Sequence, residues 1–298
     1  MSERVIVTSA QERFALAACR TLHQAGYRVT AVADQTPAAA HWSRSVDARY
    51  VLPDPKRDAD AFVDGLVEIA QREPHAVLLP ATDAAVLAAS QRRERLEPHV
   101  RMGLPPHSVV EAATDKIALV EAGRDAGLPS PETVVCETHG DGLRAARELG
   151  LPVVVKPRRT AFEQDGAVRQ RGSTYVDEAG QLDNLVDEFG SPYLIQDVVA
   201  GQVWSVAGVL TDDGLLGFAV ARYLRTWPPE GGNVAFAETV EPPPGLADKV
   251  TALLRALGWT GIFELELIRS GSTGEFTSID LNPRLYGSLA LASGAGAP

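Results

Sequence analysis

The first hundred residues alternate short apolar runs with segments in which apolar residues recur every three or four positions. A continuous apolar run indicates a buried strand, and the three-to-four spacing indicates an amphipathic helix. Because strands that alternate with helices form a parallel sheet covered by helices, we predict a doubly wound α/β domain over residues 1–104. Its expected elements are strands at Arg4–Ser9, Tyr27–Ala33 and His75–Leu79, and helices at Gln11–Gln24, Ala59–Gln71 and directly after Asp83.

The turn after the first predicted strand argues against dinucleotide binding by this domain. It reads Thr8-Ser9-Ala10-Gln11-Glu12 and lacks the glycines that let a backbone approach a pyrophosphate. A nicotinamide-dependent enzyme is therefore a minor alternative, and we expect the domain to form the wall of a cleft.

The rest of the chain mixes strands and helices less regularly. A connecting segment over residues 105–130 should hold a helix from Asp115 to Ala126. A small α+β unit is predicted over residues 131–198, and an antiparallel sheet over residues 199–298. The small unit should contain strands at Thr133–Cys136, Pro152–Val155 and Tyr193–Val199 and helices at Gly142–Leu149 and Ala179–Phe189. The antiparallel part should contain hairpins at Trp204–Ala221 and Ile262–Leu281 and a helix at Leu246–Leu257.

Composition narrows the classes of function. The net charge of −11 excludes nucleic acid as the main partner, because phosphate backbones are bound by basic surfaces. No apolar stretch reaches the length of a membrane span or a secretion signal. The two cysteines, Cys19 and Cys136, make no metal-ligand spacing and fit a reducing compartment. We therefore expect a cytoplasmic protein that binds neither membranes nor nucleic acid.

The last predicted hairpin carries the most informative acidic residues. Alternate side chains of a strand share a face, so Asp280 and Asn282 point the same way, as do Glu264 and Glu266. With a three-residue turn at 271–273, both glutamates would face the same side as Asp280. Such carboxylate and amide oxygens suit Mg²⁺. An amphipathic hairpin with solvated acids is the alternative, and the pattern does not choose between the two glutamates.

The run Ile279-Asp280-Leu281-Asn282-Pro283-Arg284 resembles the E-x-N-x-R strand of the ATP-grasp superfamily. The continuation Gly287–Ser293 resembles the branch of carbamoyl phosphate synthetases and carboxylate–amine ligases. In that branch the first metal ligand lies fourteen residues before the second, which selects Glu266. The resemblance thus implies that Glu266, Asp280 and Asn282 bind the metal and that Arg284 acts in catalysis.

Three further motifs resemble the family in the same order along the chain. They are Thr114-Asp115-Lys116, the strand Val153–Pro157, and the hinge Leu194–Gly201. The resemblance implies that Lys116 and Lys156 contact the ATP phosphates and that backbone groups near Gln196, Asp197 and Val199 bind adenine.

Two further segments resemble loops of the family, and two positions differ from the family pattern. The polar stretch Arg158–Gly172 occupies the place of a flexible loop that covers the phosphates. The segment Arg222–Asn233 resembles a loop that faces the acceptor substrate, where Arg222 or Arg225 would bind a carboxylate or the transferring phosphoryl group. The chain departs from the family at Val203, where an acid usually holds the ribose, and at Asp280, where glutamate is usual.

The resemblance implies an ATP-dependent carboxylate–amine ligase that works through an acyl phosphate and releases ADP and phosphate. Its cofactors would be ATP and Mg²⁺, with Mn²⁺ as a substitute, and its partners a small-molecule carboxylate, an amine and, as in many relatives, a second copy of the chain. The fold would be an N-terminal pre-ATP-grasp domain, a lid over residues 131–198 and a core over 199–298 that continues beyond Pro298. Two alternatives are an enzyme that activates bicarbonate and a nucleotide-binding module without turnover.

Overall fold

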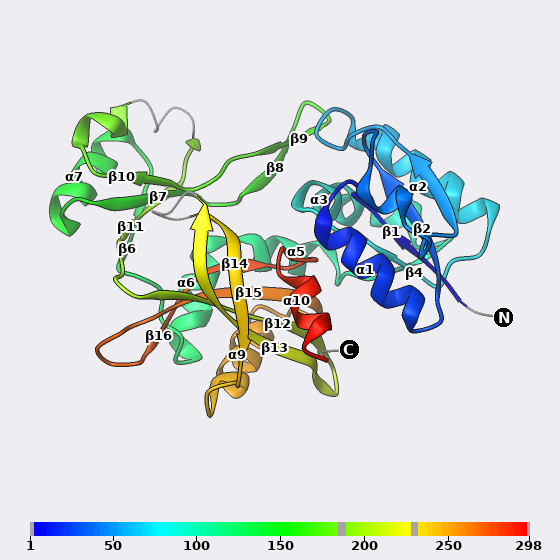
Figure 1. Ribbon diagram of the computed structural model, residues 1–298. Helices are drawn as coiled ribbons and strands as arrows, with labels where there is room; N and C mark the ends of the chain where they lie inside the picture. The colour runs from blue at the N-terminus through cyan, green and yellow to red at the C-terminus, as the bar shows by residue number, and fades with distance from the viewer. Residues whose placement is uncertain (1–2, 184–188, 228–231, 297–298) are drawn as a thin grey trace.

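The computed structural model describes residues 3–183, 189–227 and 232–296. Within them the chain forms a parallel sheet, a small lid sheet, a core antiparallel sheet and a separate two-stranded hairpin (Figure 1). This arrangement confirms the predicted α/β class with an antiparallel core. No helix in the described part of the chain is long and apolar enough to cross a membrane.

The N-terminal domain is built on a five-stranded parallel sheet in the order β3-β2-β1-β4-β5. Its strands are β1 (Arg4–Val7), β2 (Arg28–Ala33), β3 (Ala48–Val51), β4 (Val77–Leu79) and β5 (Arg101–Met102). Strands β1, β2 and β4 confirm the prediction. Strands β3 and β5 were not predicted, because one alternates exposed side chains and the other is two residues long.

Helices cover both faces of this sheet and bury two apolar clusters against it. They are α1 (Arg13–Gln24), η1 (Ala39–Trp42), α2 (Ala59–Arg72), α3 (Asp83–Gln91) and α4 (Arg93–Leu96). Side chains that cap helix N-termini satisfy backbone amides that lack a helical partner. The Asp58 carboxylate accepts from the Ala61 amide, and the Thr82 hydroxyl accepts from the Ala85 amide. The Thr82 cap places Asp83 at the start of α3, where its carboxylate accepts from Arg284.

Two short helices follow the parallel sheet, whereas the sequence predicted one. They are α5 (His107–Thr114) and α6 (Lys116–Asp125). The break lies at Asp115, which adopts an extended backbone and accepts a 3.0 Å hydrogen bond from the Ile117 amide. This cap fixes Lys116 as the first residue of α6.

The lid sheet is four-stranded, in the order β10-β7-β11-β6, with α7 packed on it. Its elements are β6 (Thr133–Cys136), α7 (His139–Leu149), β7 (Val153–Pro157), β10 (Thr174–Val176), η2 (Ala179–Gln181) and β11 (Tyr193–Asp197). A capping box between Thr138 and Asp141 starts α7. Of the predicted helix Ala179–Phe189, residues 184–188 lie outside the described part of the chain.

The predicted loop Arg158–Gly172 is instead an ordered hairpin of β8 (Ala161–Gln164) and β9 (Ala167–Gln170). Its turn uses Asp165 and Gly166, both at positive φ. Figure 1 shows this hairpin extending from the lid toward the N-terminal domain. The loop prediction was therefore wrong: the stretch forms two paired strands, and Ala167 and Val168 of β9 are buried.

The core sheet is antiparallel, in the order β14-β13-β12-β15-β16. Its elements are β12 (Gln202–Thr211), β13 (Gly214–Trp227), β14 (Asn233–Val240), α9 (Leu246–Ala256), β15 (Gly261–Arg269), β16 (Phe276–Asn282) and α10 (Leu289–Gly294). One face packs on α9 and α6 through the largest apolar cluster of the described chain. The other face carries the acidic residues, so the sheet separates the core from the candidate site.

The β15–β16 hairpin has a longer turn than predicted and a bulge that compensates for it. Residues 270–275 connect the strands, and Arg269 pairs with Phe276. The register shifts between Glu266 and Leu267, leaving Ile279 as the extra residue. A one-residue slip moves a side chain to the opposite face, so the bulge returns Asp280 to the face of Glu266.

Candidate functional site

The acidic side chains of the last hairpin lie together on the face of the core sheet that is away from α9. Glu266 pairs directly with Asp280, and Glu264 pairs directly with Asn282. The Asn282 amide nitrogen lies 3.4 Å from Glu264 Oε2. The structure therefore brings the three predicted metal ligands together, and it places Glu264 among them as well as Glu266.

Burial and mutual repulsion set the ionisation of these acids. Burial, followed by the charges of Glu264 and Asp280, raises the pKa of Glu266 to about 8. Burial also raises the pKa of Glu264. Burial acts in the same direction on Asp280, but the lysines Lys116 and Lys156 outweigh it and lower its pKa. Glu266 thus holds its proton more tightly than a free carboxyl group does, whereas Asp280 loses its proton more readily.

Two buried lysines reach this cluster from different parts of the fold. Lys116 starts α6 and is 6% exposed, and Lys156 lies in β7 of the lid and is 7% exposed. Lys116 Nζ lies 3.3 Å from Asp280 Oδ1 and donates to Thr160 Oγ1 at 2.9 Å. Lys156 Nζ donates at 2.7 Å to the carbonyl oxygen of Ile279, the residue left unpaired by the bulge. Burial lowers the pKa of Lys156 to about 8.

The acid cluster and Asn282 offer oxygen ligands to a divalent cation. No three His, Cys, Asp or Glu side chains within the described ranges are arranged to hold a metal among themselves. The paired Glu266 and Asp280 carboxylates with the Asn282 amide oxygen supply hard oxygen ligands. Burial and, after it, the charges of Glu264 and Asp280 raise the pKa of Glu266, and a bound cation would favour its ionised form. The residues therefore fit Mg²⁺ whose remaining ligands come from phosphate and water.

Arg284 connects the core to the N-terminal domain. Its Nε donates to Asp83 Oδ1 at 2.6 Å, and another of its nitrogens donates to Asn282 Oδ1 at 3.0 Å. Burial would lower the pKa of Arg284, but the charge and hydrogen bond of Asp83 raise it. The predicted catalytic arginine is therefore held against Asp83 at the start of α3.

A small cavity of about 30 Å³ lies between α3, the base of β8 and the site. Its polar wall includes Asp83, Lys116, Thr160, Asp280 and Asn282. Because α3 belongs to the N-terminal domain, that domain forms one wall of the site. The space is large enough for a water or a single ion.

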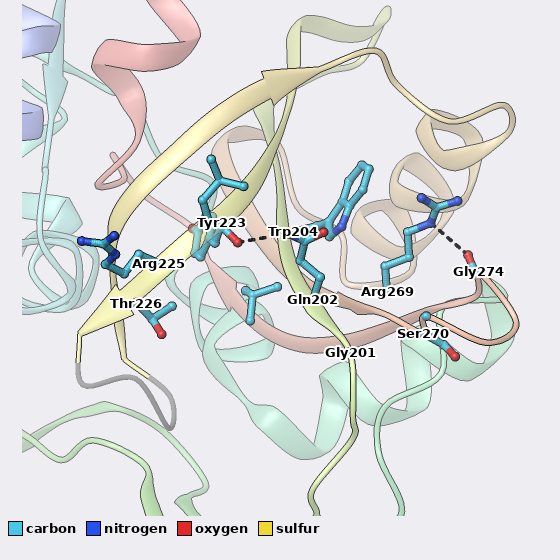
Figure 2. Close-up of a pocket in the computed structure, with 12 residues that line it drawn as sticks. Gly201, Gln202, Trp204, Tyr223, Arg225, Thr226, Arg269, Ser270 and Gly274 are labelled. Atoms are coloured by element: carbon cyan, nitrogen blue, oxygen red, sulfur yellow. Dashed lines mark hydrogen bonds between the residues drawn. The ribbon is translucent and has the colours of Figure 1, made fainter.

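A larger cavity, of about 700 Å³, opens where β12 enters the core sheet. Figure 2 shows Gln202, Tyr223 and Arg225 along it, with Arg269 and Ser270 at its other end. Tyr223 joins this cavity to the acids, since its hydroxyl lies 3.2 Å from Glu264 Oε1 and 3.3 Å from Glu266 Oε1. Val203, at the position where an acid was expected, also lines it.

The two candidate arginines differ in their surroundings. Arg222 is paired across the sheet with Glu238 of β14, to which its Nε donates at 2.9 Å. Arg225 is exposed, lines the large cavity and has no ion-pair partner among the residues that the structure describes. Residues 228–231 of the predicted acceptor loop lie outside the described residues. Arg225 is therefore the arginine available to an anionic ligand.

The predicted hinge begins in the lid, since Gln196 and Asp197 are the last two residues of β11. The Gln196 side chain is buried in the lid and donates to Thr133 Oγ1 at 2.9 Å. The Asp197 amide donates to the Glu132 carbonyl at 3.0 Å. Val199 lies in the connection between β11 and β12 and is half-buried. Any backbone contact of a ligand with Asp197 would therefore use its carbonyl.

The structure adds residues that sequence reasoning passed over. Asp115 is 4% exposed and holds Arg158 Nε at 2.7 Å and an Arg159 nitrogen at 3.1 Å. Its signal was present, because a polar residue before a helix predicts an N-cap. Tyr223 and Asp83 had no such signal, because their partners lie far away in sequence.

The chain is similar in sequence to parts of longer curated proteins. No family model matches the chain. It is 27% identical over 307 residues to the N-terminal section of the carbamoyl phosphate synthase large chain of Aquifex aeolicus, covering 93% of this chain and 51% of that section. It is 24% identical over 293 residues to the large chain from Neisseria meningitidis serogroup B, of which it covers 26%. The chain thus spans about half or a quarter of the curated relatives that it matches.

Solved structures show the same fold at low sequence identity. The biotin carboxylase of Campylobacter jejuni superposes with a TM-score of 0.72 at 14% identity, covering 97% of this chain and 67% of that one. The L-amino acid ligase of Bacillus licheniformis superposes with a TM-score of 0.70 at 17% identity, covering 97% and 69%. The chain therefore has the ATP-grasp fold, as the sequence motifs predicted.

Proposed function

We propose that the chain is the nucleotide-binding part of an ATP-dependent ligase that joins a carboxylate to an amine through an acyl phosphate. One observation carries the proposal: Lys156 of the lid binds the Ile279 carbonyl, and Lys116 of the connecting segment binds the carboxylate of the next residue, Asp280. Two buried cations beside a cluster of acids form a site that combines phosphate and metal ligands. The similarity to carbamoyl phosphate synthase large chains and to amino acid ligases supports the same reaction class.

Lys116, Lys156 and Arg284 would have different roles in phosphoryl transfer. Lys116 and Lys156 would bind the phosphates and spread the negative charge that develops during transfer. Arg284, fixed by Asp83, would hold the transferring group beside Asn282. The substrate carboxylate attacks phosphorus directly, so no nucleophile from the protein is required. The β8–β9 hairpin and the lid would keep water from the acyl phosphate before the amine attacks it.

The acid cluster would hold Mg²⁺ between the protein and the phosphates. Asp280 and Asn282, with Glu266 or Glu264 opposite them, are the proposed ligands. When bound, the cation would neutralise phosphate oxygens and orient them for in-line transfer. The large cavity beside Tyr223 would take the nucleoside or the acceptor, with Arg225 at its wall.

Bicarbonate is the second candidate for the activated carboxylate. The curated relatives are carbamoyl phosphate synthases, and one structural neighbour, a biotin carboxylase domain with a TM-score of 0.68, is described in complex with MgADP and bicarbonate anion. A cavity of about 30 Å³ beside Lys116 and Asp280 favours a small substrate at that point.

ADP release from Mg-ATP tests the proposal. The purified chain is incubated with bicarbonate, with amino acids or with other carboxylates, each with and without an amine. We expect release that depends on one carboxylate, and hydroxylamine should trap its acyl phosphate as a hydroxamate. Release without any carboxylate would contradict ligase activity, and Mg-ATP binding without release would identify a nucleotide-binding module instead.

A further inference from the structure

The β8–β9 hairpin contacts the candidate site at its base and the N-terminal domain at its tip. At the base, Thr160 accepts the 2.9 Å hydrogen bond from Lys116 Nζ. At the tip, the Gly166 carbonyl accepts from the Ala59 amide at 3.0 Å. One short hairpin therefore connects the site to the domain that lies farthest from it in sequence order.

Apolar burial holds the far strand of the hairpin against the N-terminal domain. Val168 is 1% exposed and belongs to the apolar cluster formed by that domain, and Ala161 packs against the same cluster. The Val168 amide donates to the Pro55 carbonyl at 3.0 Å. Removing a valine side chain from water favours the docked position of the hairpin.

A charged pair reinforces this contact. Two nitrogens of Arg92, in the N-terminal domain, each lie 2.9 Å from an oxygen of Glu163 in β8. The same guanidinium donates to both oxygens of Asp60, at 2.9 and 3.2 Å. The Arg92 side chain is 13% exposed, so water screens the pair only partly. Paired hydrogen bonds between arginine and a carboxylate are strong and directional.

We propose that the Arg92–Glu163 pair is a latch that holds the β8–β9 hairpin closed over the site before nucleotide binds. The latch fixes Thr160 and, through it, the ammonium group of Lys116 beside Asp280. Neither Arg92 nor Glu163 lines the site cavities, so both are positioning residues. The role assigned to nucleotide rests on the proposed function, whereas the docking of the hairpin does not.

Hydrogen exchange of the whole chain tests the latch directly. Glu163→Gln removes the charge but keeps the shape, and Glu163→Lys places a second cation opposite Arg92. Arg72→Gln is the matched control, because Arg72 pairs with Glu68 on the exposed side of α2, within the N-terminal domain. We expect the amides of residues 161–170 to exchange about tenfold faster in the glutamine variant, and faster again in the lysine variant. The control should exchange at the parent rate.

A second arm measures the affinity of the same proteins for a non-hydrolysable ATP analogue with Mg²⁺. Affinity should fall in the order parent, Glu163→Gln, Glu163→Lys, with Arg72→Gln equal to the parent. Unchanged hairpin exchange in Glu163→Lys would overturn the latch. Faster exchange with unchanged affinity would overturn its positioning role. If the parent itself binds no nucleotide, the proposed function and the positioning role both fail, and the exchange arm still decides whether the hairpin is latched.

Discussion

The ammonium group of Lys156 donates a 2.7 Å hydrogen bond to the carbonyl oxygen of Ile279, and so joins the lid to the core strand that carries Asp280. This bond exists because β16 bulges at Ile279 and frees that carbonyl from the ladder. The same bulge turns Asp280 toward Glu266. One irregular residue therefore sets both the lid contact and the acid cluster.

Replacing either buried lysine should weaken nucleotide binding. Lys116→Met and Lys156→Met keep the length of the side chain and remove its charge, so each should lower the affinity for Mg-ATP by about tenfold or more. Calorimetric titration measures the change. Lys249→Met is the control, because Lys249 is exposed on α9, behind the core sheet. Parent-like binding by a folded Lys156→Met protein would remove that residue from the site.

Substitutions in the acid cluster should weaken Mg²⁺-dependent nucleotide binding. Glu264→Gln, Glu266→Gln and Asp280→Asn should each reduce the Mg²⁺-dependent part of nucleotide binding by about tenfold or more, because each removes a negative charge from one cluster. Glu275→Gln is the control from the exposed turn of the same hairpin. Titration of each variant with and without Mg²⁺ gives the answer. A glutamate variant that keeps the full Mg²⁺ dependence is not a ligand.

The two candidate arginines should behave differently. Arg225→Ala should lower kcat/KM for the anionic substrate by about tenfold, since this side chain lines the large cavity without an ion-pair partner in the described chain. Arg222→Ala breaks the pair with Glu238, which is half-exposed, and should change the free energy of unfolding by less than about 1 kcal/mol. Steady-state kinetics and urea unfolding check the two outcomes. The opposite pattern would show that Arg222 leaves Glu238 to bind substrate.

Acid should weaken the N-terminal domain through His75. Its ring lies 2.9 Å from Thr30 Oγ1 and 2.6 Å from the Glu73 carbonyl, and burial lowers its pKa below the ordinary value. The unfolded chain therefore binds the proton first, so the stabilising effect is complete above about pH 6.5 and is lost as the pH falls below it. His75→Gln should unfold more easily at neutral pH and show a shallower loss of stability in acid. An equal slope for parent and variant in urea unfolding between about pH 7 and pH 5 would contradict this.

Local periodicity predicted most elements, because each one is encoded by neighbouring residues. The strand Thr133–Cys136 was predicted with its observed bounds. The β8–β9 hairpin was missed because Val168 is buried by the N-terminal domain, which is distant in sequence. Strand β14 was not predicted either, because it forms by pairing with β13, and its own residues do not indicate this pairing.

The sequence predicted which residues form the site, but only the structure shows which of them lie opposite one another. The alternation Asp280–Asn282 gave a shared face, but the bulge at Ile279 and the longer turn determine which glutamate faces which ligand. The fourteen-residue spacing that selected Glu266 cannot test that choice, since Glu264 lies opposite Asn282 on the same face. Contacts between residues that are far apart in sequence, such as Arg284 with Asp83, cannot be predicted from neighbouring residues.

The central claim is that this chain binds Mg-ATP between Lys156, Lys116 and the acids of the β15–β16 hairpin. Calorimetric titration of the purified chain with a non-hydrolysable ATP analogue, with and without Mg²⁺, tests it most directly, with Asp280→Asn as the paired sample. We expect binding by the parent that needs Mg²⁺ and that Asp280→Asn loses. Absence of binding by the parent, or equal binding by the folded Asp280→Asn protein, would contradict the claim.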